Sequence, residues 1–424
     1  MKAIIVSIGD EVLIGQIVNT NAAWMGKVLN DVGIEVIENI VISDTSAHIT
    51  TTLDHALSKA DIILTTGGLG PTKDDLTTKT LAQYFGAELV LQEEVLERLK
   101  QMLEQRGREL TEQNQKVALV PKDCKVILNP KGTAPALWFE RNGKSVIAMP
   151  GVPYEMKDFM NKFILPEFEK RGVTQSLFHK TIMTAGTGET VLAEHIKDIE
   201  AALPPHIKLA FLPRLGIVRL RLSGKGDDKQ ALEVDVNEYA QQIVQKIPKY
   251  VYGYDEKPLA AAVGDLLLER NATLSVAESC TGGYISQQIV QNAGSSAYYE
   301  GGIIAYSYEL KSKLLGVSMD LLNTHGAVSQ EAVEAMAKGA IERMGTDYAI
   351  ATSGIAGPGG GMPDKPVGTI WMATASKTEI FSKKYQFTPY RDINIPLSAN
   401  MALNGLRRFM LRELEEVSLI SFKT

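Results

Sequence analysis

Twice in this chain a short apolar segment of β-forming residues leads directly into a glycine-rich turn, and a segment of helical periodicity follows. The first junction joins residues 61–66 to 67–70, and the second joins residues 273–276 to 277–283. Strands with few alternating polar residues are typical of parallel sheets that helices cover on both faces. The pattern therefore predicts doubly wound, three-layer α/β/α domains, which bind ligands at the carboxyl ends of their strands.

The N-terminal part of the chain supports this fold class, because apolar strands and amphipathic segments alternate along it. Trp24, Val28, Leu29 and Val32 recur at helical spacing, and Gly33 follows them as a C-cap. Further periodic segments lie between apolar runs of strand length. The expected strands are residues 3–8, 34–41, 61–66 and 145–149, and the expected helices are 21–32, 49–57 and 154–164.

Length and composition exclude several classes of protein. A chain of 424 residues predicts two to four domains, and a net charge of −6 argues against a general binder of nucleic acid or membrane surfaces. The two cysteines, Cys124 and Cys280, are far apart and form neither a zinc motif nor a disulfide framework. The first apolar run reaches Gly9 too soon for a signal peptide, and no run is long enough to span a membrane. We therefore expect a cytoplasmic α/β protein.

A smaller unit separates two large domains. From about residue 172 the segments become shorter, with expected strands at 179–184 and 217–222 and expected helices at 191–203 and 232–247. Arg219 and Arg221 alternate with apolar residues, which predicts the solvated face of a half-buried strand. We therefore expect three domains, at residues 1–171, 172–252 and 253–424.

The glycine-rich turn after residue 66 has the composition of a phosphate-binding loop. Gly67, Gly68 and Gly70 let backbone N–H groups approach a phosphate closely. Asp74 and Asp75 follow as hard oxygen ligands for a divalent cation that bridges the phosphate. The alternative is a simple turn whose aspartates cap the next helix. Because a buried strand precedes the loop, we favour phosphate and metal.

Ser279 lies in the second junction, between an apolar strand and the helical segment 284–290. Free N–H groups at a helix N-terminus favour developing negative charge, so a serine there has the position of a nucleophile beside an oxyanion site. Serine is also a common N-cap, and on this stretch alone capping is the more frequent outcome. The neighbouring Cys280 is a rival nucleophile, but no histidine lies near it in sequence to activate it.

Another strand–helix junction supplies groups that could activate the serine. Tyr306 is expected at the carboxyl end of a strand, and Lys311 in the first turns of the next helix. A lysine held among apolar residues has a lowered pKa and can act as a general base without histidine. The alternative is an exposed lysine on an amphipathic helix. The glycine-rich segment 354–361 follows a further apolar strand, so it is expected at the same edge of the sheet.

Several long motifs occur in the order found in one family. They are IGDE, GQIVNTN, TTGGLGPTKDDLT, NPKGTAP, MPGVPYEM, AESCTGG, YSYELK and GIAGPGGGMPDKPVGT. In these motifs the chain resembles the competence/damage-inducible protein A (CinA) family over almost its whole length. The resemblance implies a molybdopterin-binding-like domain, then a KH-like α+β domain, then a CinA C-terminal domain. The KH-like domain has no clear GXXG clamp, so no direct binding of nucleic acid is expected.

For the C-terminal domain the resemblance implies nicotinamide mononucleotide (NMN) deamidase activity without a cofactor. Ser279 would be the nucleophile, Lys311 the general base, and Tyr306 a proton-transfer or orienting hydroxyl. An oxyanion hole of backbone N–H groups, loop glycines and one arginine would bind the substrate: Thr281, Gly282, Gly283, Gly354, Gly357 and Arg391. The chain departs from the family's pattern in lacking the usual Gly-Asp before this arginine.

For the N-terminal domain the resemblance implies a metal-dependent ADP-ribose pyrophosphatase. The cofactor would be a divalent ion (Mg, Mn or Co) near Asp74 and Asp75. The phosphates would lie against the glycine-rich loop, on Gly67, Gly68, Gly70, Pro71 and Thr72. The implied partners are small nucleotides and a second copy in a homodimer, with no membrane. Two alternatives stay open: binding of a pterin, and a scaffold role in competence or the DNA-damage response.

Overall fold

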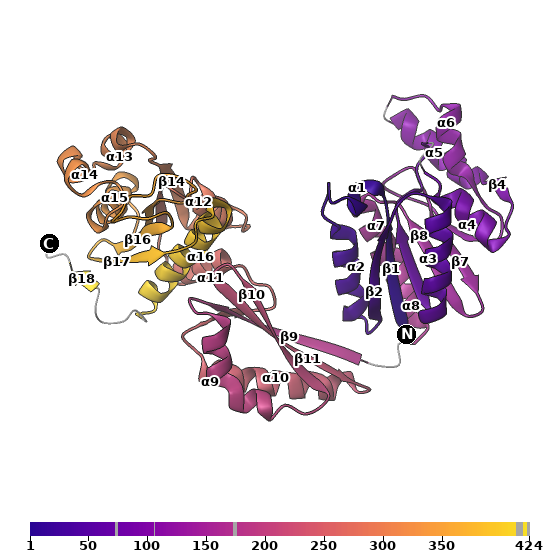
Figure 1. The fold of residues 1–424 in the computed structure, drawn as a ribbon, viewed down its shortest axis with the longest axis horizontal. Helices are drawn as coiled ribbons and strands as arrows, with labels where there is room; N and C mark the ends of the chain where they lie inside the picture. Colours follow the sequence, from indigo (N-terminus) through magenta and orange to yellow (C-terminus); the bar gives the residue numbers. More distant parts are fainter. Residues whose placement is uncertain (73–74, 106, 173–175, 413–418, 422–424) are drawn as a thin grey trace. The chain divides into compact units, whose positions relative to one another are not determined.

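The computed structural model describes the chain except for residues 73–74, 106, 173–175, 413–418 and 422–424. The chain forms two compact units, one of Met1–Phe178 with Gly224–Glu233 and one of His179–Ser223 with Val234–Thr424. Two six-stranded sheets and one four-stranded sheet organise the described residues, and helices pack on each (Figure 1). Of the helices in the described ranges, none is long and apolar enough to cross a lipid bilayer.

The N-terminal sheet has the strand order β2-β1-β3-β8-β7-β6, and its first four strands run parallel. Alternate residues of β1 enter different cores: Ala3 and Ile5 pack with the helices of one face, Ile4 and Val6 with those of the other. Burial of both faces confirms the predicted three-layer fold. The strands are β1 (Lys2–Ile8), β2 (Glu35–Ile42), β3 (Ile62–Thr66), β6 (Lys125–Ile127), β7 (Ala136–Arg141) and β8 (Lys144–Met149).

The helices of this domain lie on the two faces of the sheet and beyond one end of it. One face is covered by α2 (Thr20–Asp31) and α7 (Pro153–Phe159), the other by α3 (Ser46–Lys59) and α4 (Thr77–Phe85). A short antiparallel pair, β4 with β5, accompanies the segment between β3 and β6. The remaining elements are α1 (Asp10–Leu13), β4 (Leu89–Leu91), α5 (Glu93–Gln105), α6 (Glu112–Gln115), β5 (Leu119–Pro121) and α8 (Leu165–Lys170).

The middle domain is a four-stranded sheet in the order β10-β11-β9-β12 with two helices, which confirms the predicted α+β unit. Its elements are β9 (Ser176–Ala185), α9 (Glu189–Ala201), β10 (Ile207–Arg214), β11 (Ile217–Gly226), α10 (Lys229–Lys246) and β12 (Val251–Tyr254). The predicted alternation on β11 is present, and its arginine face is partly solvated. Val218, Leu220 and Leu222 are buried, whereas Arg219 and Arg221 on the alternate face are half-buried.

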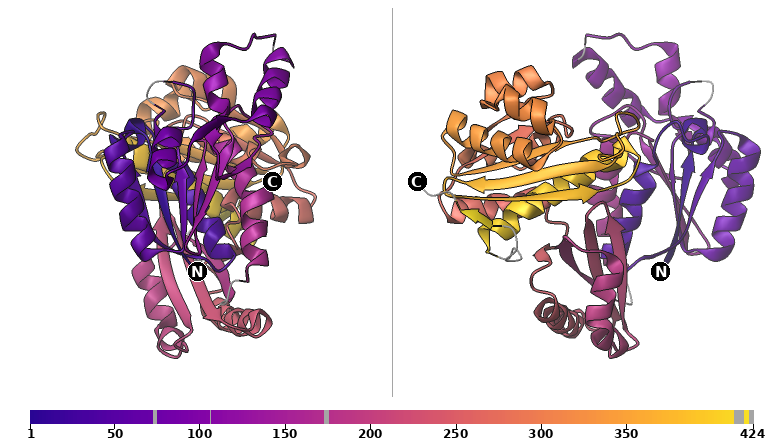
Figure 2. Two further views of the ribbon diagram at one scale, coloured as in Figure 1. Left: turned by 90° about the vertical axis from the view of Figure 1, so that its right-hand side faces the viewer. Right: turned by 60° about the vertical axis from the view of Figure 1, so that its left-hand side comes forward.

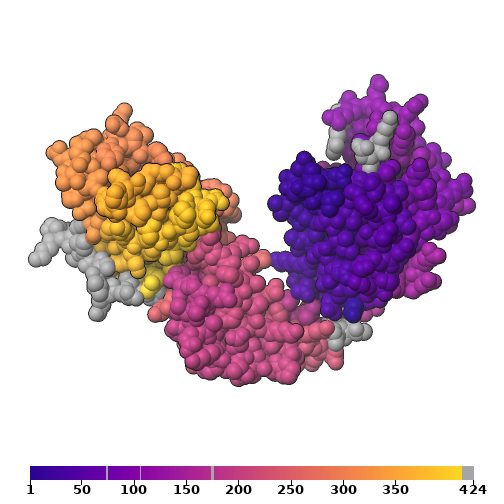
Figure 3. Space-filling view, in the orientation of Figure 1, coloured from indigo at the N-terminus to yellow at the C-terminus, as the bar shows by residue number. Residues whose placement is uncertain are grey.

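The long helix α16 (Arg391–Met410) makes several of the contacts between the middle and C-terminal domains. Asn400 Nδ2 donates a hydrogen bond to the carbonyl oxygen of Leu215 at 2.7 Å. Arg407, further along the helix, donates to the carbonyl oxygens of Lys249 and Val251 at 2.8 and 3.1 Å. Figure 3 shows these magenta and yellow surfaces in contact. Because α16 also begins at the edge where the loops of the C-terminal sheet gather, it spans that domain from end to end.

The C-terminal sheet has the order β14-β13-β15-β16-β17-β18, in which β14, β13 and β15 run parallel. Its strands are β13 (Leu274–Glu278), β14 (Tyr299–Ile304), β15 (Tyr348–Gly354), β16 (Thr369–Ser376), β17 (Glu379–Gln386) and β18 (Leu419–Ser421). Helices cover both faces (Figure 2, right), which confirms a second three-layer domain. One face carries α11 (Leu259–Glu269), α12 (Tyr284–Val290) and α16, and the other α13 (Tyr308–Leu315), α14 (Met319–His325) and α15 (Gln330–Met344).

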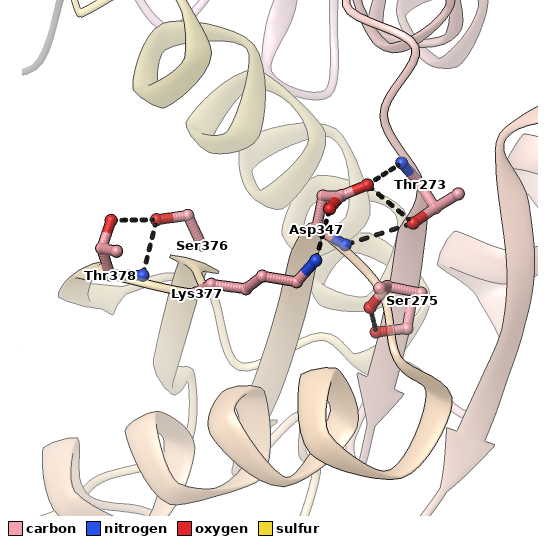
Figure 4. A network of polar contacts seen from close by, with 7 residues as sticks. Thr273, Ser275, Asp347, Ser376, Lys377 and Thr378 are labelled. Atoms are coloured by element: carbon pink, nitrogen blue, oxygen red, sulfur yellow. Dashed lines mark hydrogen bonds and ion pairs between the residues drawn. The ribbon is translucent and has the colours of Figure 1, made fainter. Parts of the chain in front are cut away.

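The amino ends of β13 and β15 are tied together by Asp347, at the edge of the sheet away from the glycine-rich loops (Figure 4). Its carboxylate accepts hydrogen bonds from the backbone N–H and the hydroxyl of Thr273 at 2.9 and 3.0 Å, and from Lys377 Nζ at 2.6 Å. The Lys377 hydrogen bond is the largest cause that lowers the pKa of Asp347. These contacts fix the pairing of Leu274 with Tyr348, and therefore the alignment of both strands at their carboxyl ends.

Candidate active site

The candidate active site lies at the carboxyl edge of the C-terminal sheet. The three parallel strands end there at Glu278, Ile304 and Gly354. The antiparallel strand β16 begins at the same edge, since Ile370 pairs with Gly354. The segments that follow β13, β14 and β15 therefore leave the sheet side by side. In a doubly wound sheet this edge is where ligands bind.

Ser279 and Lys311 are brought together from two of these strand–helix connections. Ser279 follows β13 directly, and Lys311 lies in α13, the helix after β14. Ser279 Oγ and Lys311 Nζ are 3.0 Å apart. A pair that lies 32 residues apart in sequence is thus within hydrogen-bonding distance, as a nucleophile and its base must be.

Lys311 is completely buried, so the alternative of an exposed surface lysine is wrong. Its exposed fraction is 0%, and Nζ donates hydrogen bonds to the carbonyl oxygens of Ala305 and Tyr306 at 2.7 and 3.1 Å. Burial lowers the pKa of Lys311 from 10.5 to about 8, because the charged form loses its hydration. No carboxylate of the described residues is among the groups that shift this pKa.

The three contacts of Lys311 Nζ serve both protonation states of the lysine. The ammonium donates one hydrogen each to Ser279 Oγ and to the carbonyl oxygens of Ala305 and Tyr306. Loss of one proton leaves an uncharged amine. Such an amine has two hydrogens to donate and one lone pair. The carbonyl oxygens of Ala305 and Tyr306 accept the two hydrogens. The lone pair then faces Ser279 Oγ, which can donate its own hydrogen to it. In this arrangement the lone pair is directed at the hydroxyl whose proton a general base would remove.

Tyr306 enters the site through its backbone rather than its side chain. β14 ends at Ile304, so Tyr306 lies in the loop after the strand and not at its predicted carboxyl end. The side chain of Tyr306 is 64% exposed, and within the described residues its hydroxyl makes no hydrogen bond with Ser279 or Lys311. The predicted proton-transfer role of this hydroxyl stays a prediction.

Glu278 holds the turn after β13, and the motif-based interpretation assigns it no role. It is fully buried, and its Oε2 accepts hydrogen bonds from the N–H groups of Gly283 and Ile285 at 3.0 and 3.1 Å. Its Oε1 accepts from the N–H and the hydroxyl of Ser286 at 2.9 and 2.7 Å. The predicted capping role of Ser279 is therefore wrong: the N-cap of α12 is Gly283, and the preceding glutamate satisfies its free N–H groups.

Of the three N–H groups predicted to form the oxyanion hole, two already donate hydrogen bonds within the turn. The N–H of Gly282 donates to the carbonyl oxygen of Ser279 at 3.2 Å, and the N–H of Gly283 donates to Glu278. Both glycines have left-handed backbone angles, with φ of 60° and 98°, so the turn requires them for its shape. In the described chain the N–H of Thr281 has no hydrogen-bond acceptor. Thr281 is therefore a donor that this turn leaves for a developing oxyanion.

The rival nucleophile Cys280 is in an unsuitable environment. Its side chain is 7% exposed, and burial raises the pKa of its thiol to about 12. A thiol with so high a pKa is protonated at neutral pH, whereas the thiolate is the reactive form. The geometry therefore favours Ser279 over its neighbour.

Arg391 and the glycine-rich loop after β15 are held against each other at this edge. The Nε of Arg391 donates to the carbonyl oxygen of Gly357, and the fully buried Asn394 donates to that of Ala356 at 2.8 Å. A Cβ at Gly354 or Gly357 would lie within 3 Å of neighbouring atoms, so the close approach requires glycine at both. Among the described residues the terminal nitrogens of Arg391 make no hydrogen bond, and they are the atoms that bind phosphate in a bidentate manner.

The N-terminal domain carries a second candidate site, a pocket of about 870 Å³ at the carboxyl edge of its parallel strands. The predicted Gly67, Gly68, Gly70 and Thr72 line it, whereas Pro71 does not. Gly67 has a φ of 107°, and a Cβ there would lie 2.0 Å from the carbonyl oxygen of Ile8. The pocket also contains polar residues without a predicted role: Asp10, Glu11, Asn19, Asn21, Asp44 and Glu155.

The two predicted metal ligands have different outcomes. Asp74 lies outside the described residues. Asp75 lines the pocket, and its Oδ2 accepts hydrogen bonds from the N–H and the hydroxyl of Thr72. Within the part of the chain that the structure describes, no three His, Cys, Asp or Glu side chains are placed to hold a metal ion together. The donors present fit an ion of the magnesium type, which one or two carboxylates and substrate phosphates can hold.

The fold and these sites define a class: a multidomain α/β protein with a candidate site at the carboxyl edge of each large sheet. Family models match all three domains in order. They are a probable molybdopterin binding domain over residues 4–170, the damage-inducible protein CinA KH domain over 179–253 and the CinA C-terminal domain over 256–410.

Comparison over the whole chain gives the family itself. A CinA-like protein of Cytophaga hutchinsonii is 43% identical over 95% of this chain and 97% of its own length. A putative competence-damage inducible protein of Symbiobacterium thermophilum is 39% identical over 89% of each chain. The chain belongs to the CinA family, as its motifs predict. The protein CinA of Thermoplasma acidophilum, a solved structure, shares 37% identity over 40% of this chain and 96% of that chain, with a TM-score of 0.36.

The burial of Lys311 predicts a pH-dependent effect of removing it. Because its pKa is lower in the folded state, the unfolded chain binds more protons between pH 8 and 10.5, and stability rises with pH in that window. Below pH 8 the cost of burying the amine is fully present. We therefore expect Lys311→Met to stabilise the C-terminal domain most at neutral pH, with a gain that fades toward pH 10.5.

Urea unfolding at neutral and alkaline pH measures this effect. Lys313→Met is the matched control, since Lys313 is an exposed lysine of the same helix. Its effect on stability should not vary with pH in this window. A Lys311→Met variant whose effect is equally constant would contradict the lowered pKa.

Proposed function

We propose that the C-terminal domain hydrolyses the amide of nicotinamide mononucleotide through a seryl acyl-enzyme. The observation that carries the proposal is the 3.0 Å contact between Ser279 Oγ and the buried amine of Lys311. An amine with a pKa of about 8 is uncharged in roughly one-tenth of molecules at pH 7. It is therefore a competent base near neutral pH, and no histidine is needed.

The proposed reaction has two halves. In the first, Lys311 Nζ takes the proton of Ser279 as Oγ attacks the carboxamide carbon, and the oxyanion faces the N–H of Thr281. Lys311 then returns the proton to the amide nitrogen, the C–N bond breaks and ammonia leaves. In the second half, water attacks the ester carbon and Lys311 takes a proton from the water. The ester C–O bond then breaks, and Lys311 returns the proton to Ser279 Oγ. The products are nicotinate mononucleotide and the free enzyme.

The binding of a nucleotide phosphate is proposed at Arg391. The N-terminus of α12 is not available for an anion, because the Glu278 carboxylate already accepts its N–H groups. Arg391 lies at the same edge of the sheet, and its side chain is oriented by the carbonyl oxygen of Gly357. A phosphate there would meet the terminal guanidinium nitrogens. The distance from Arg391 to the serine would then select a substrate with a phosphate at one end and an amide at the other.

Ser279→Ala should lower the rate of ammonia release from NMN by at least about 10³-fold, because it removes the atom that forms the acyl-enzyme. Lys311→Met should have a similar effect, since the serine then has no base. Cys280→Ala is the control and should stay within a few-fold of the wild-type rate. A Ser279→Ala enzyme with unchanged turnover, or a Cys280→Ala enzyme without activity, would contradict the assignment.

For the N-terminal domain we propose a metal-dependent ADP-ribose pyrophosphatase. The glycine-rich turn and the carboxylates that line one large pocket support it. Gly67, Gly68 and Gly70 would hold the phosphates, and Asp75, with Asp74, would hold the ion. A bound divalent ion would activate water and neutralise charge on the phosphates. The alternatives are pterin binding, which the match to a probable molybdopterin binding domain suggests, and a scaffold role in competence or DNA damage, which the names of relatives suggest.

Removal of divalent ions should abolish ADP-ribose hydrolysis and leave NMN deamidation unchanged, since no metal is proposed at the serine site. Activity measured for both substrates before and after chelation, and again after addition of Mg²⁺, Mn²⁺ or Co²⁺, tests this. Gly67→Ala should have the same selective effect, because its Cβ would lie 2.0 Å from the Ile8 carbonyl oxygen. ADP-ribose hydrolysis that persists in chelator would exclude the proposed metal role.

A further inference from the structure

The buried Glu278 does more than complete a helix end. We propose that it is a positioning residue of the serine site, which holds Ser279 against Lys311 and keeps the Thr281 N–H open to the substrate. The inference rests on the proposed deamidase function. It assigns the residue no contact with the substrate.

The side chain of Glu278 fixes the conformation of the turn that carries Ser279. Its two oxygens accept four hydrogen bonds, from the N–H groups of Gly283, Ile285 and Ser286 and from the Ser286 hydroxyl. A fully buried carboxylate is stable only where hydrogen bonds replace its hydration, so this geometry is strongly preferred over others. Together with the two left-handed glycines, these hydrogen bonds fix the backbone of the turn from residue 279 to 286.

The backbone of Glu278 fixes the other half of the pair. Its carbonyl oxygen accepts a hydrogen bond from the N–H of Ala305 at 2.9 Å. Ala305 in turn presents its own carbonyl oxygen to Lys311 Nζ at 2.7 Å. One residue therefore orders both the turn of the nucleophile and the carbonyl that orients the base.

A further hydrogen bond links the side chain of Glu278, through Ser286, to the strand β14. The Ser286 hydroxyl, which donates to Glu278, accepts a hydrogen bond from the Tyr299 hydroxyl at 2.7 Å. Tyr299 begins β14, the strand that leads to the Lys311 helix. Glu278, Ser286 and Tyr299 thus connect β13, α12 and β14. Loss of the carboxylate should disturb the spacing of Ser279 and Lys311 before it disturbs the whole domain.

Glu278→Gln tests the proposal with little change in volume. An amide offers one acceptor oxygen, and its NH₂ group would face two of the four donors, so the turn must shift. Misplacement of reacting groups by about 1 Å is expected to lower kcat for NMN deamidation by about 100-fold. KM should stay within about threefold, because the substrate does not touch this residue. The pH midpoint of the rate should stay near that of the wild type, since burial and not Glu278 lowers the pKa of Lys311.

Glu334→Gln is the matched control. Glu334 is a half-buried glutamate of the same domain that accepts hydrogen bonds from the side chains of Gln330 and Ser382. Its replacement makes the same change of charge away from the turn and should leave kcat unchanged. Rates are compared per folded molecule, with thermal unfolding as the check on folding. Should Glu278→Gln not fold, Glu278→Asp keeps the charge but is one methylene too short to reach all four donors, and it should also lose kcat with KM preserved.

A folded Glu278→Gln or Glu278→Asp enzyme with the kcat of the wild type would overturn the positioning role. If Ser279→Ala is inactive in the same assay, the deamidase proposal survives that result and only the positioning role fails. If Ser279→Ala keeps full activity, the deamidase proposal fails and the positioning role fails with it. A loss of kcat at constant KM and constant pH midpoint, absent from Glu334→Gln, is the result expected.

Discussion

A lysine kept away from water is the feature on which the proposed chemistry depends. Lys311 has an exposed fraction of 0%, and its amine contacts two carbonyl oxygens and one hydroxyl. An ammonium group in that position loses most of its hydration and meets no carboxylate within the described residues that would offset the loss. The same burial that destabilises the charged form makes the amine a base. Stability and reactivity are therefore coupled at this one side chain.

The doubly wound fold explains how such a lysine can be placed beside a serine. Parallel strands deliver their connections to one edge, so residues 32 apart meet without a long loop. At the opposite edge, Asp347 fixes the alignment of the strands that end at the site. The N-terminal domain has the same architecture, and the corresponding edge of its sheet carries a wide pocket lined by glycines and carboxylates. Fold does not fix function, so the loops of one architecture can carry the two different chemistries proposed for these domains.

Much of the fold could be predicted because its signals are local. The apolar residues of β1 indicate burial on both faces, and alternate residues do enter two different cores. The Ser279–Lys311 pair could be predicted from motifs, but its contact could not, because it depends on the packing of α13 against the rest of the domain. The boundary of β14 falls two residues earlier than expected, and this changes Tyr306 from a side-chain to a backbone contributor.

Other features needed three-dimensional information. Glu278 is the last residue of an apolar strand, and a charged residue there was the available signal, but its four donors follow only from the fold of the turn. Arg219 and Arg221 have the pattern of a solvated strand face, but both are half-buried in the fold. Periodicity reports which residues share a face of a strand and carries no information about what packs on that face.

The most direct test of this account is the protonation state of Lys311 itself. Its amine can be titrated by NMR in protein labelled with ¹³C at the lysine Cε atoms, and the Lys311→Met spectrum identifies its signal. We predict one lysine signal that titrates near pH 8, well below the ordinary lysine value of 10.5, and is absent from the variant. A Lys311 signal that titrates with the surface lysines would contradict the claim that a buried, uncharged amine activates Ser279.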